Sequence, residues 1–190
     1  MKLRADPVGA APTEAPLTIE LFRWSTDAER APLLTALSAR PPAPPAAPAA
    51  APAGGRAGRG GRGRGGPPPP PPSPLARLTA AVKAAPTIGF IWGGGPTGYS
   101  IKYAWHSTSS DGTERIVLAT DRRLGANQPS WPQGKLADDV DFTVIETWLD
   151  GKGSGEGKTS LTARVVVDDA EKTLALDAYA AAPAQLKVKR

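Results

Sequence analysis

The 190-residue sequence has no cysteine and a single histidine, His106. Disulfide bonds and thiolate metal sites are therefore excluded, and a zinc site built on one histidine would need a carboxylate spacing that the sequence lacks. No apolar run approaches the roughly 20 residues of a membrane-spanning helix. We therefore expect no metal, no cofactor and no membrane span.

The N-terminus, MKLRADPVGAAPTEAP, has the charged start of an export signal but not the apolar stretch that should follow it. As written, the chain is expected to be soluble and unexported; an upstream leader missing from this start would instead make it exported or periplasmic. Residues 1–15 are small, polar and rich in proline and alanine, and we predict a disordered tail.

Residues 41–74 contain no acid, no aromatic residue and no Leu, Ile, Val or Met. This low-complexity tract of Pro, Gly, Ala and Arg has almost nothing to bury, so it cannot offset the entropy cost of ordering. It predicts a disordered insertion in a single domain formed by residues 16–40 and 75–190. The tract carries four arginines, against a net charge of +5 for the whole chain: Arg56, Arg59, Arg62 and Arg64. The remainder is nearly neutral, which argues against a broad DNA-binding surface.

Period-two alternation predicts a first strand over residues 17–24, with Leu17, Ile19 and Leu21 on one face. Phe22 falls on the opposite face, with the polar residues of this strand. Two short helices should follow. Thr26 and Glu29 have the spacing of a capping box, and Ser73-Pro74 is a typical helix start. Pro32 predicts either a kink or a later start near residue 31.

From residue 87 onward the pattern is that of strands, at 87–92, 99–107 and 114–120, followed by a hairpin over 138–169. In that hairpin we expect GKGSGEGK to be the turn between two strands. The predicted fold is α+β, mainly an antiparallel sheet of about seven or eight strands curled into a partial barrel. The two helices should lie between the first and second strands.

Two glycine-rich segments resemble nucleotide-binding motifs without their structural context. Gly93–Gly98 matches GxGxxG, but an alternating strand pattern follows where a helix is required. Residues 153–159 resemble a P-loop, but Lys152 replaces the first glycine and no helix follows. We therefore expect no bound nucleotide.

Glu146 shares a predicted strand face with Val144 and Trp148. A carboxylate on an apolar face is either a functional acid or half of an ion pair. The second interpretation is favoured, with Arg115 or Arg23 on a neighbouring strand as the partner.

Two sets of residues are candidates for binding. The RGG units of the tract, with Arg56, Arg59, Arg62 and Arg64, are of the kind that contacts RNA, although no aromatic residue is interleaved with them. The aromatic residues Trp92, Tyr99 and Trp131 could line a ligand pocket or fill the core. Trp131 is the most suggestive of the three because prolines flank it on a loop.

Three segments together, RWSTDAER (23–30), ERIVLATDR (114–122) and FTVIETWLDGKGSGEGK (142–158), resemble an uncharacterised family of bacterial proteins that usually carry an export signal. The resemblance covers residues 16–40 and 75–190 but not the tract. It implies a short link between the two helices in relatives. The family has no assigned activity, so the resemblance implies no functional residue.

These observations predict a non-enzymatic domain with a binding or envelope-associated structural role. One alternative is nucleic-acid binding through the Arg-Gly tract. The other is a small apolar or sugar ligand held in a barrel mouth lined by Trp92, Tyr99 and Trp131.

Overall fold

The computed structural model describes residues 1–8, 16–38, 70–93, 95, 97–125, 140–181 and 183–190. Most of the predicted insertion, including its four arginines, lies outside these residues, as do residues 9–15. The elements follow the chain in this order: β1 (Lys2–Pro7), β2 (Leu17–Leu21), α1 (Asp27–Ser38), α2 (Pro74–Ala84), β3 (Gly89–Trp92), β4 (Tyr99–Thr108), β5 (Glu114–Thr120), β6 (Val144–Leu149), β7 (Ser154–Thr159), β8 (Val165–Asp168), β9 (Thr173–Leu176) and β10 (Leu186–Lys189).

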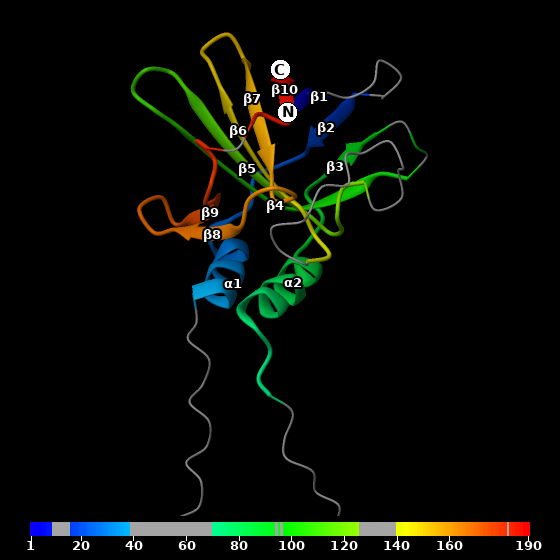
Figure 1. Cartoon of the computed structure of the whole chain (residues 1–190), viewed down its shortest axis with the longest axis vertical. Helices are drawn as coiled ribbons and strands as arrows, with labels where there is room; N and C mark the ends of the chain where they lie inside the picture. Colours follow the sequence, from blue (N-terminus) through cyan, green and yellow to red (C-terminus); the bar gives the residue numbers. More distant parts are fainter. Residues whose placement is uncertain (9–15, 39–69, 94, 96, 126–139, 182) are drawn as a thin grey trace, which may run out of the picture.

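The strands form a closed antiparallel barrel in the order β1-β10-β7-β6-β5-β4-β3-β2, and β8 and β9 form a separate two-stranded hairpin (Figure 1). The predicted α+β class with a mainly antiparallel sheet is confirmed. The barrel is closed rather than partial, because β1 pairs with β2 on one side and with β10 on the other. A closed sheet has no free edge strand.

Strand β1 corrects the prediction of a loose N-terminal tail for the first residues of the chain. Leu3 and Ala5 point into the barrel, while Lys2 and Arg4 face solvent. With only two inward apolar side chains, the strand gives a weak sequence signal and is stabilised by its two neighbours. As a consequence, the helices follow the second strand instead of lying between the first and second.

The barrel interior is an apolar core to which every barrel strand except β7 contributes buried side chains. We call this set the inner core: Leu3, Ala5, Leu17, Ile19, Leu21, Ile88, Ile91, Tyr99, Ile101, Ala104, Ile116, Leu118, Leu124, Ile145, Leu149, Leu161, Leu186 and Val188. In β7, Gly157 faces Thr147 across the sheet, where a larger side chain would collide with the inner core.

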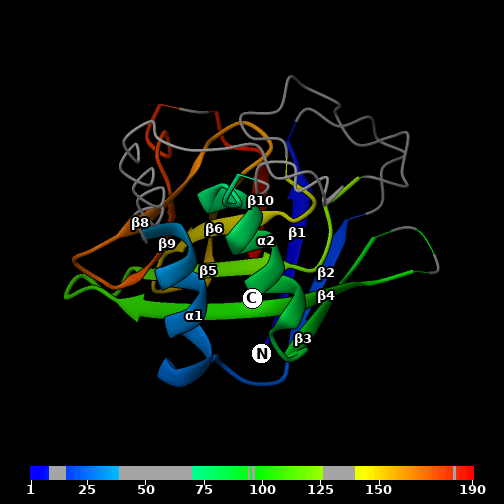
Figure 2. The ribbon, with the colours of Figure 1, turned by 90° about the horizontal axis from the view of Figure 1, so that it is seen from below.

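A second apolar cluster, the outer core, lies between the outer face of β4–β6 and the two helices and the β8–β9 hairpin. Its buried members are Leu33, Leu78, Val82, Tyr103, Val117, Ala119, Val140, Phe142, Val144, Ala163, Val165, Leu174 and Leu176. Figure 2 shows α1 and α2 side by side across this face of the barrel. Arg77 Nε on α2 donates to the carbonyl of Ala36 on α1 at 3.2 Å, which joins the two helices.

Strand β4 supplies residues to both cores because its register shifts between Ile101 and Tyr103. Tyr99 and Ile101 lie in the inner core, whereas Tyr103 lies in the outer core. The simple alternation expected from sequence would have kept all three on one face. A β-bulge adds one residue to one strand, which reverses the side-chain alternation beyond it.

The predicted helix starts are confirmed. The Thr26 backbone N–H donates to Glu29 at 2.9 Å and the Glu29 N–H donates to Thr26 Oγ1 at 3.3 Å, which completes the capping box. The pKa of Glu29 is lowered to about 2, first by the hydrogen bonds from Arg23 and next by the backbone N–H of Thr26. Ser73 Oγ accepts from Ala76, and α1 continues through Pro32.

The segment GKGSGEGK is mostly strand β7 instead of the predicted turn. The turn is limited to residues 150–153, with Gly153 at φ +77°, and the run after Thr159 leads on to the separate hairpin. Glycines are required in β7 because its backbone approaches β6 closely. A Cβ at position 155 would lie 1.8 Å from the carbonyl oxygen of Trp148.

We therefore predict that Gly155→Ala lowers the free energy of unfolding by about 3 kcal/mol or more, because β6 and β7 must separate to admit a methyl group. The matched control is Gly151→Ala, since an added Cβ there has no neighbour within 4 Å. Urea unfolding of the two variants measures the difference. Equal stability of the two variants would contradict the close approach of β7 to β6.

Candidate functional site

Three aromatic side chains form a strip on the outer face of the barrel, across β2 and β3. Phe22 lies directly after β2, and Phe90 and Trp92 lie on β3. The rings of Phe22 and Phe90 are 5.9 Å apart at 69°, and those of Phe90 and Trp92 are 5.7 Å apart at 38°. Phe22 is 63% exposed and Trp92 is 40% exposed. We call Phe22, Phe90 and Trp92 the aromatic strip.

The strip follows from strand alternation and from the β2–β3 register. Gly89 and Ile91 of β3 are buried, so Phe90 and Trp92 point outward. Pairing of Glu20 with Phe90 places Phe22, which lies two residues beyond Glu20, beside the Phe90 ring. The sequence correctly predicted that Phe22 lies on the polar face of its strand. The position of Phe90 next to it was missed, because α1, α2 and the tract between them separate the two strands in the chain, so no local pattern indicates the β2–β3 register.

The Trp92 ring is held in place by Gly98, which comes just before β4. A Cβ added at Gly98 would lie 2.9 Å from two ring carbons of Trp92, so the indole lies directly on the glycine backbone. The Gly98 carbonyl accepts a hydrogen bond from Arg122. One end of the strip is thus fixed before any ligand arrives, which lowers the entropy cost of binding.

The surroundings of the strip are polar but electrically balanced. Thr18 lies opposite Trp92, and Glu20 and Ser100 flank Phe90 on the two neighbouring strands. The carboxylate of Glu20 is paired with Lys2 at 3.1 Å. Because this charge is balanced by its neighbour, the strip suits an uncharged ligand better than an anion.

The aromatic residues named as candidate pocket lining do not share a pocket. Tyr99 is 3% exposed and belongs to the inner core, where its hydroxyl accepts from the Gly125 N–H at 3.2 Å. Trp92 points to the opposite side of the sheet. Trp131 lies outside the described residues, and so do the candidate RNA-contact residues Arg56, Arg59, Arg62 and Arg64.

Glu146 forms an ion pair with Arg115, as the second interpretation of this carboxylate on an apolar strand face predicted. Arg115 Nε donates to Glu146 Oε1 at 2.8 Å, and both side chains are almost fully buried. The other carboxylate oxygen of Glu146 accepts from the backbone N–H of Leu176 at 2.9 Å. Arg23, the other suggested partner, pairs with Glu29 instead.

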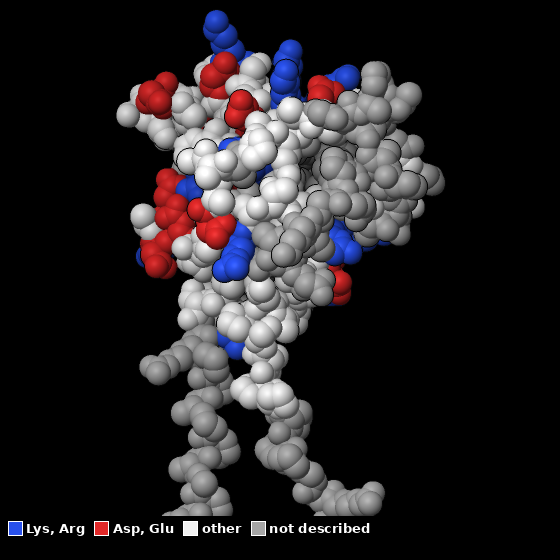
Figure 3. Space-filling view, viewed as in Figure 1, with Lys and Arg blue, Asp and Glu red and all other residues white. Residues whose placement is uncertain are grey.

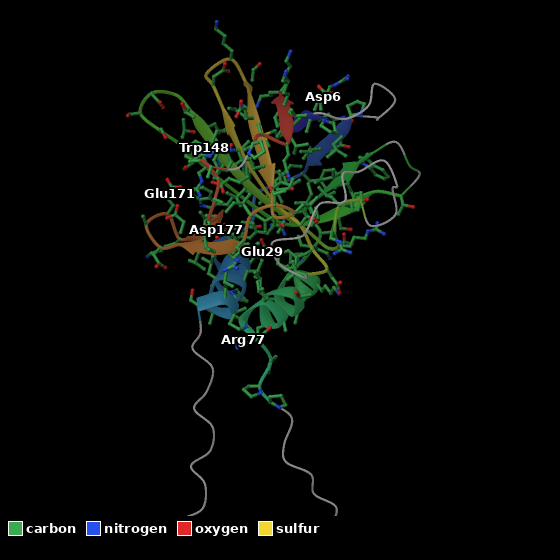
Figure 4. All side chains as sticks on the ribbon, viewed as in Figure 1. Asp6, Glu29, Arg77, Trp148, Glu171 and Asp177 are labelled. Carbon is green, nitrogen blue, oxygen red and sulfur yellow. The ribbon has the colours of Figure 1, made fainter. Side chains whose placement is uncertain are left out.

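Arg115 also joins the β8–β9 hairpin to the barrel. Its Nη1 atom donates to Asp168 at 2.7 Å and to Glu171 at 2.8 Å, and its guanidinium lies 5.7 Å from the Trp105 ring and 5.3 Å from the Trp148 ring. Figure 3 shows acidic side chains gathered on this side, and Figure 4 shows Trp148 and Glu171 on the same flank. With its Nε and Nη1 donors taken up by carboxylates and its side chain almost fully buried, Arg115 serves structure and offers little to a ligand.

Carboxylates and burial set the ionisation of this network. Burial by itself would lower the pKa of Arg115, but hydrogen bonds and charges from the carboxylates outweigh it, and the pKa is raised. The hydrogen bond from Arg115 lowers the pKa of Asp168. Burial raises the pKa of Tyr179, whose ring meets Trp148 edge-on. Arg115 and Asp168 therefore both remain ionised near neutral pH.

An open groove of about 430 Å³ lies between α1 and β8, with Leu34 and Val167 in its lining. Its charged lining residues, Asp169 and Lys172, are exposed. The volume is in the range of small-molecule sites, but a groove this open encloses little of a ligand's surface.

Within the described part of the chain, no group of three or more His, Asp or Glu is placed to hold a metal ion. His106 stacks on Trp24 at 4.1 Å, and its Nδ1 atom lies 3.5 Å from Glu114. Among the same residues, no helix is long and apolar enough to cross a membrane. The P-loop-like residues are part of β7 and are followed by no helix.

Comparison of the chain with protein-family models, with curated proteins and with solved structures found no match in any of the three. The geometry of the described residues is therefore the basis for the functional proposal.

The Arg115 network predicts a pH dependence of stability. The lowered pKa of Asp168 stabilises the native state above the unfolded carboxyl pKa of about 3.9, and this contribution is lost as the pH falls through the lower native value. Asp168→Asn should therefore unfold more easily than the native chain by about 1–3 kcal/mol at neutral pH. Below pH 4 the difference should shrink.

Asn keeps the side-chain oxygen that accepts the Ala170 and Glu171 N–H groups. It replaces the oxygen that accepts from Arg115 by an amide NH2 group, so the charge and this one hydrogen bond are lost together. Asp169→Asn, at the exposed neighbouring position, is the matched control and should change stability by less than about 0.5 kcal/mol. Denaturant unfolding from pH 2.5 to 7 measures both variants. A pH-independent deficit for Asp168→Asn would show that its charge does not act through Arg115.

Proposed function

We propose that the protein is a non-catalytic binding domain that holds an extended, uncharged polypeptide segment on the aromatic strip. The observation that carries this proposal is the exposure of the strip. Three large apolar side chains are exposed among the described residues, and Phe22 and Trp92 are two of them. Clustered exposed aromatic rings are typical of interaction sites and contribute strongly to binding energy.

The rest of the barrel leaves few other ways to bind a chain. The closed barrel offers no edge for strand addition, so a segment bound to the barrel wall must be held by side chains. The described interior is filled by the apolar inner core, which argues against the predicted ligand in a barrel mouth. The strip lies outside this core and needs no rearrangement to be reached.

The tilt of the rings favours a peptide over a sugar. Neighbouring rings are inclined by 69° and 38°, so the three rings do not form one flat surface. Such a surface is ridged, whereas stacking on the face of a sugar ring is best served by a flat platform. Small side chains or proline rings of an extended peptide can fit between the ridges.

The test is selection from a displayed peptide library on the full-length protein. The selected peptides should bind Phe22→Ser at least about tenfold more weakly than the native chain, because a central aromatic contact contributes 1.4 kcal/mol or more. The substitution should leave stability within about 0.5 kcal/mol, since Phe22 is mostly exposed.

Val8→Ser is the matched control, because Val8 is a 42% exposed apolar residue outside the strip. It should bind the selected peptides as the native chain does. Equal binding by the native chain and Phe22→Ser, or binding only to a parallel panel of oligosaccharides, would contradict the proposal.

A further inference from the structure

The chain itself contains a segment with the chemistry that the aromatic strip suits. Residues 41–48 read PPAPPAAP, so Pro42, Pro45 and Pro48 recur at every third position. A polyproline II helix has three residues per turn and a rise of about 3.1 Å per residue. In that conformation the three prolines would share one face, with about 9 Å between successive rings.

The aromatic strip has the side-chain chemistry and the length that suit such a proline face. Domains that recognise polyproline II segments hold them in grooves lined by aromatic rings, and the bound helix loses little entropy because its backbone is already restricted. The aromatic strip has two gaps between three inclined rings, with neighbouring centroids 5.9 and 5.7 Å apart. Its length is therefore on the order of one polyproline turn.

Charge and connectivity agree with this pairing. Residues 41–53 carry no charge, and charged residues beside the strip are paired: Glu20 with Lys2, and Arg23, which follows Phe22, with Glu29. The tract starts three residues beyond Ser38, the last residue of α1, and 31 residues separate Ser38 from Pro70. A tethered segment acts at an effective concentration in the millimolar range, so even weak intrinsic affinity would populate the bound form.

We propose that the aromatic strip binds residues 41–48 of the same molecule, with two successive prolines of the Pro42, Pro45 and Pro48 face, about 9 Å apart, lying against the three rings. This inference rests on the proposed function, because it requires the strip to accept an extended peptide. The tract would then occupy the strip reversibly and compete with any external segment.

The lack of cysteine allows a direct test on the full chain. Ala46→Cys introduces a unique thiol off the proposed docking face, and a nitroxide attached there broadens nearby proton signals. We expect loss of the Trp92 indole signal and of the Phe22 and Phe90 ring signals, relative to the reduced, diamagnetic label. The Trp148 indole is the internal control and should stay sharp, because β5 and β4 separate β6 from β3.

The matched control carries the same label with Pro42, Pro45 and Pro48 each replaced by glycine, and the broadening at Trp92 should disappear. Mixing isotope-labelled chains with spin-labelled, unenriched chains separates contacts within one molecule from contacts between copies. Broadening of equal strength in the mixed sample would overturn the intramolecular contact in favour of a second copy. Broadening spread equally over Trp92 and Trp148 would also overturn it.

The outcomes separate this inference from the proposed function. Unchanged strip signals, together with selected peptides that bind the native chain and not Phe22→Ser, would refute docking of the tract and leave the binding function standing. Unchanged signals without any strip-dependent peptide would refute both.

Discussion

Closure of the barrel by β1 is the constraint on which the rest of the structure depends. β1 pairs with β2 and β10, and this double pairing defines an inside and an outside for every strand. The inside is filled by the inner core. The outside is divided between the outer core, which the helices and the β8–β9 hairpin cover, and a face that carries the aromatic strip.

Close approach of the backbone has a second role in this architecture. Gly155 permits β7 to lie against Trp148 of β6, and Gly98 supports the indole of Trp92. The same residue type thus serves stability at one site and orients a binding residue at another. Arg115 forms ion pairs with three carboxylates, those of Glu146, Asp168 and Glu171. These ion pairs tie the β8–β9 hairpin to β5 and β6.

Local signals in the sequence predicted local structure well. The capping box of Thr26 and Glu29, the Ser73 cap and the pairing of Glu146 with Arg115 each depend on few residues and clear chemistry. β1 was missed because it has only two inward apolar residues. β7 was misread because glycine is rare in strands, and its presence there is explained only by the backbone of the neighbouring strand. The strip was not predicted beyond the outward direction of Phe22, since its assembly depends on the register between β2 and β3.

The central claim is that the aromatic strip binds a proline-rich extended segment, and one titration tests it most directly. A peptide of residues 39–53 is added to the full-length chain with Pro42, Pro45 and Pro48 replaced by glycine, so that its own tract no longer competes. The account predicts saturable changes in the ring chemical shifts of Phe22, Phe90 and Trp92, with the Trp148 indole unchanged. No change at these rings, or changes centred on the groove between α1 and β8, would contradict it.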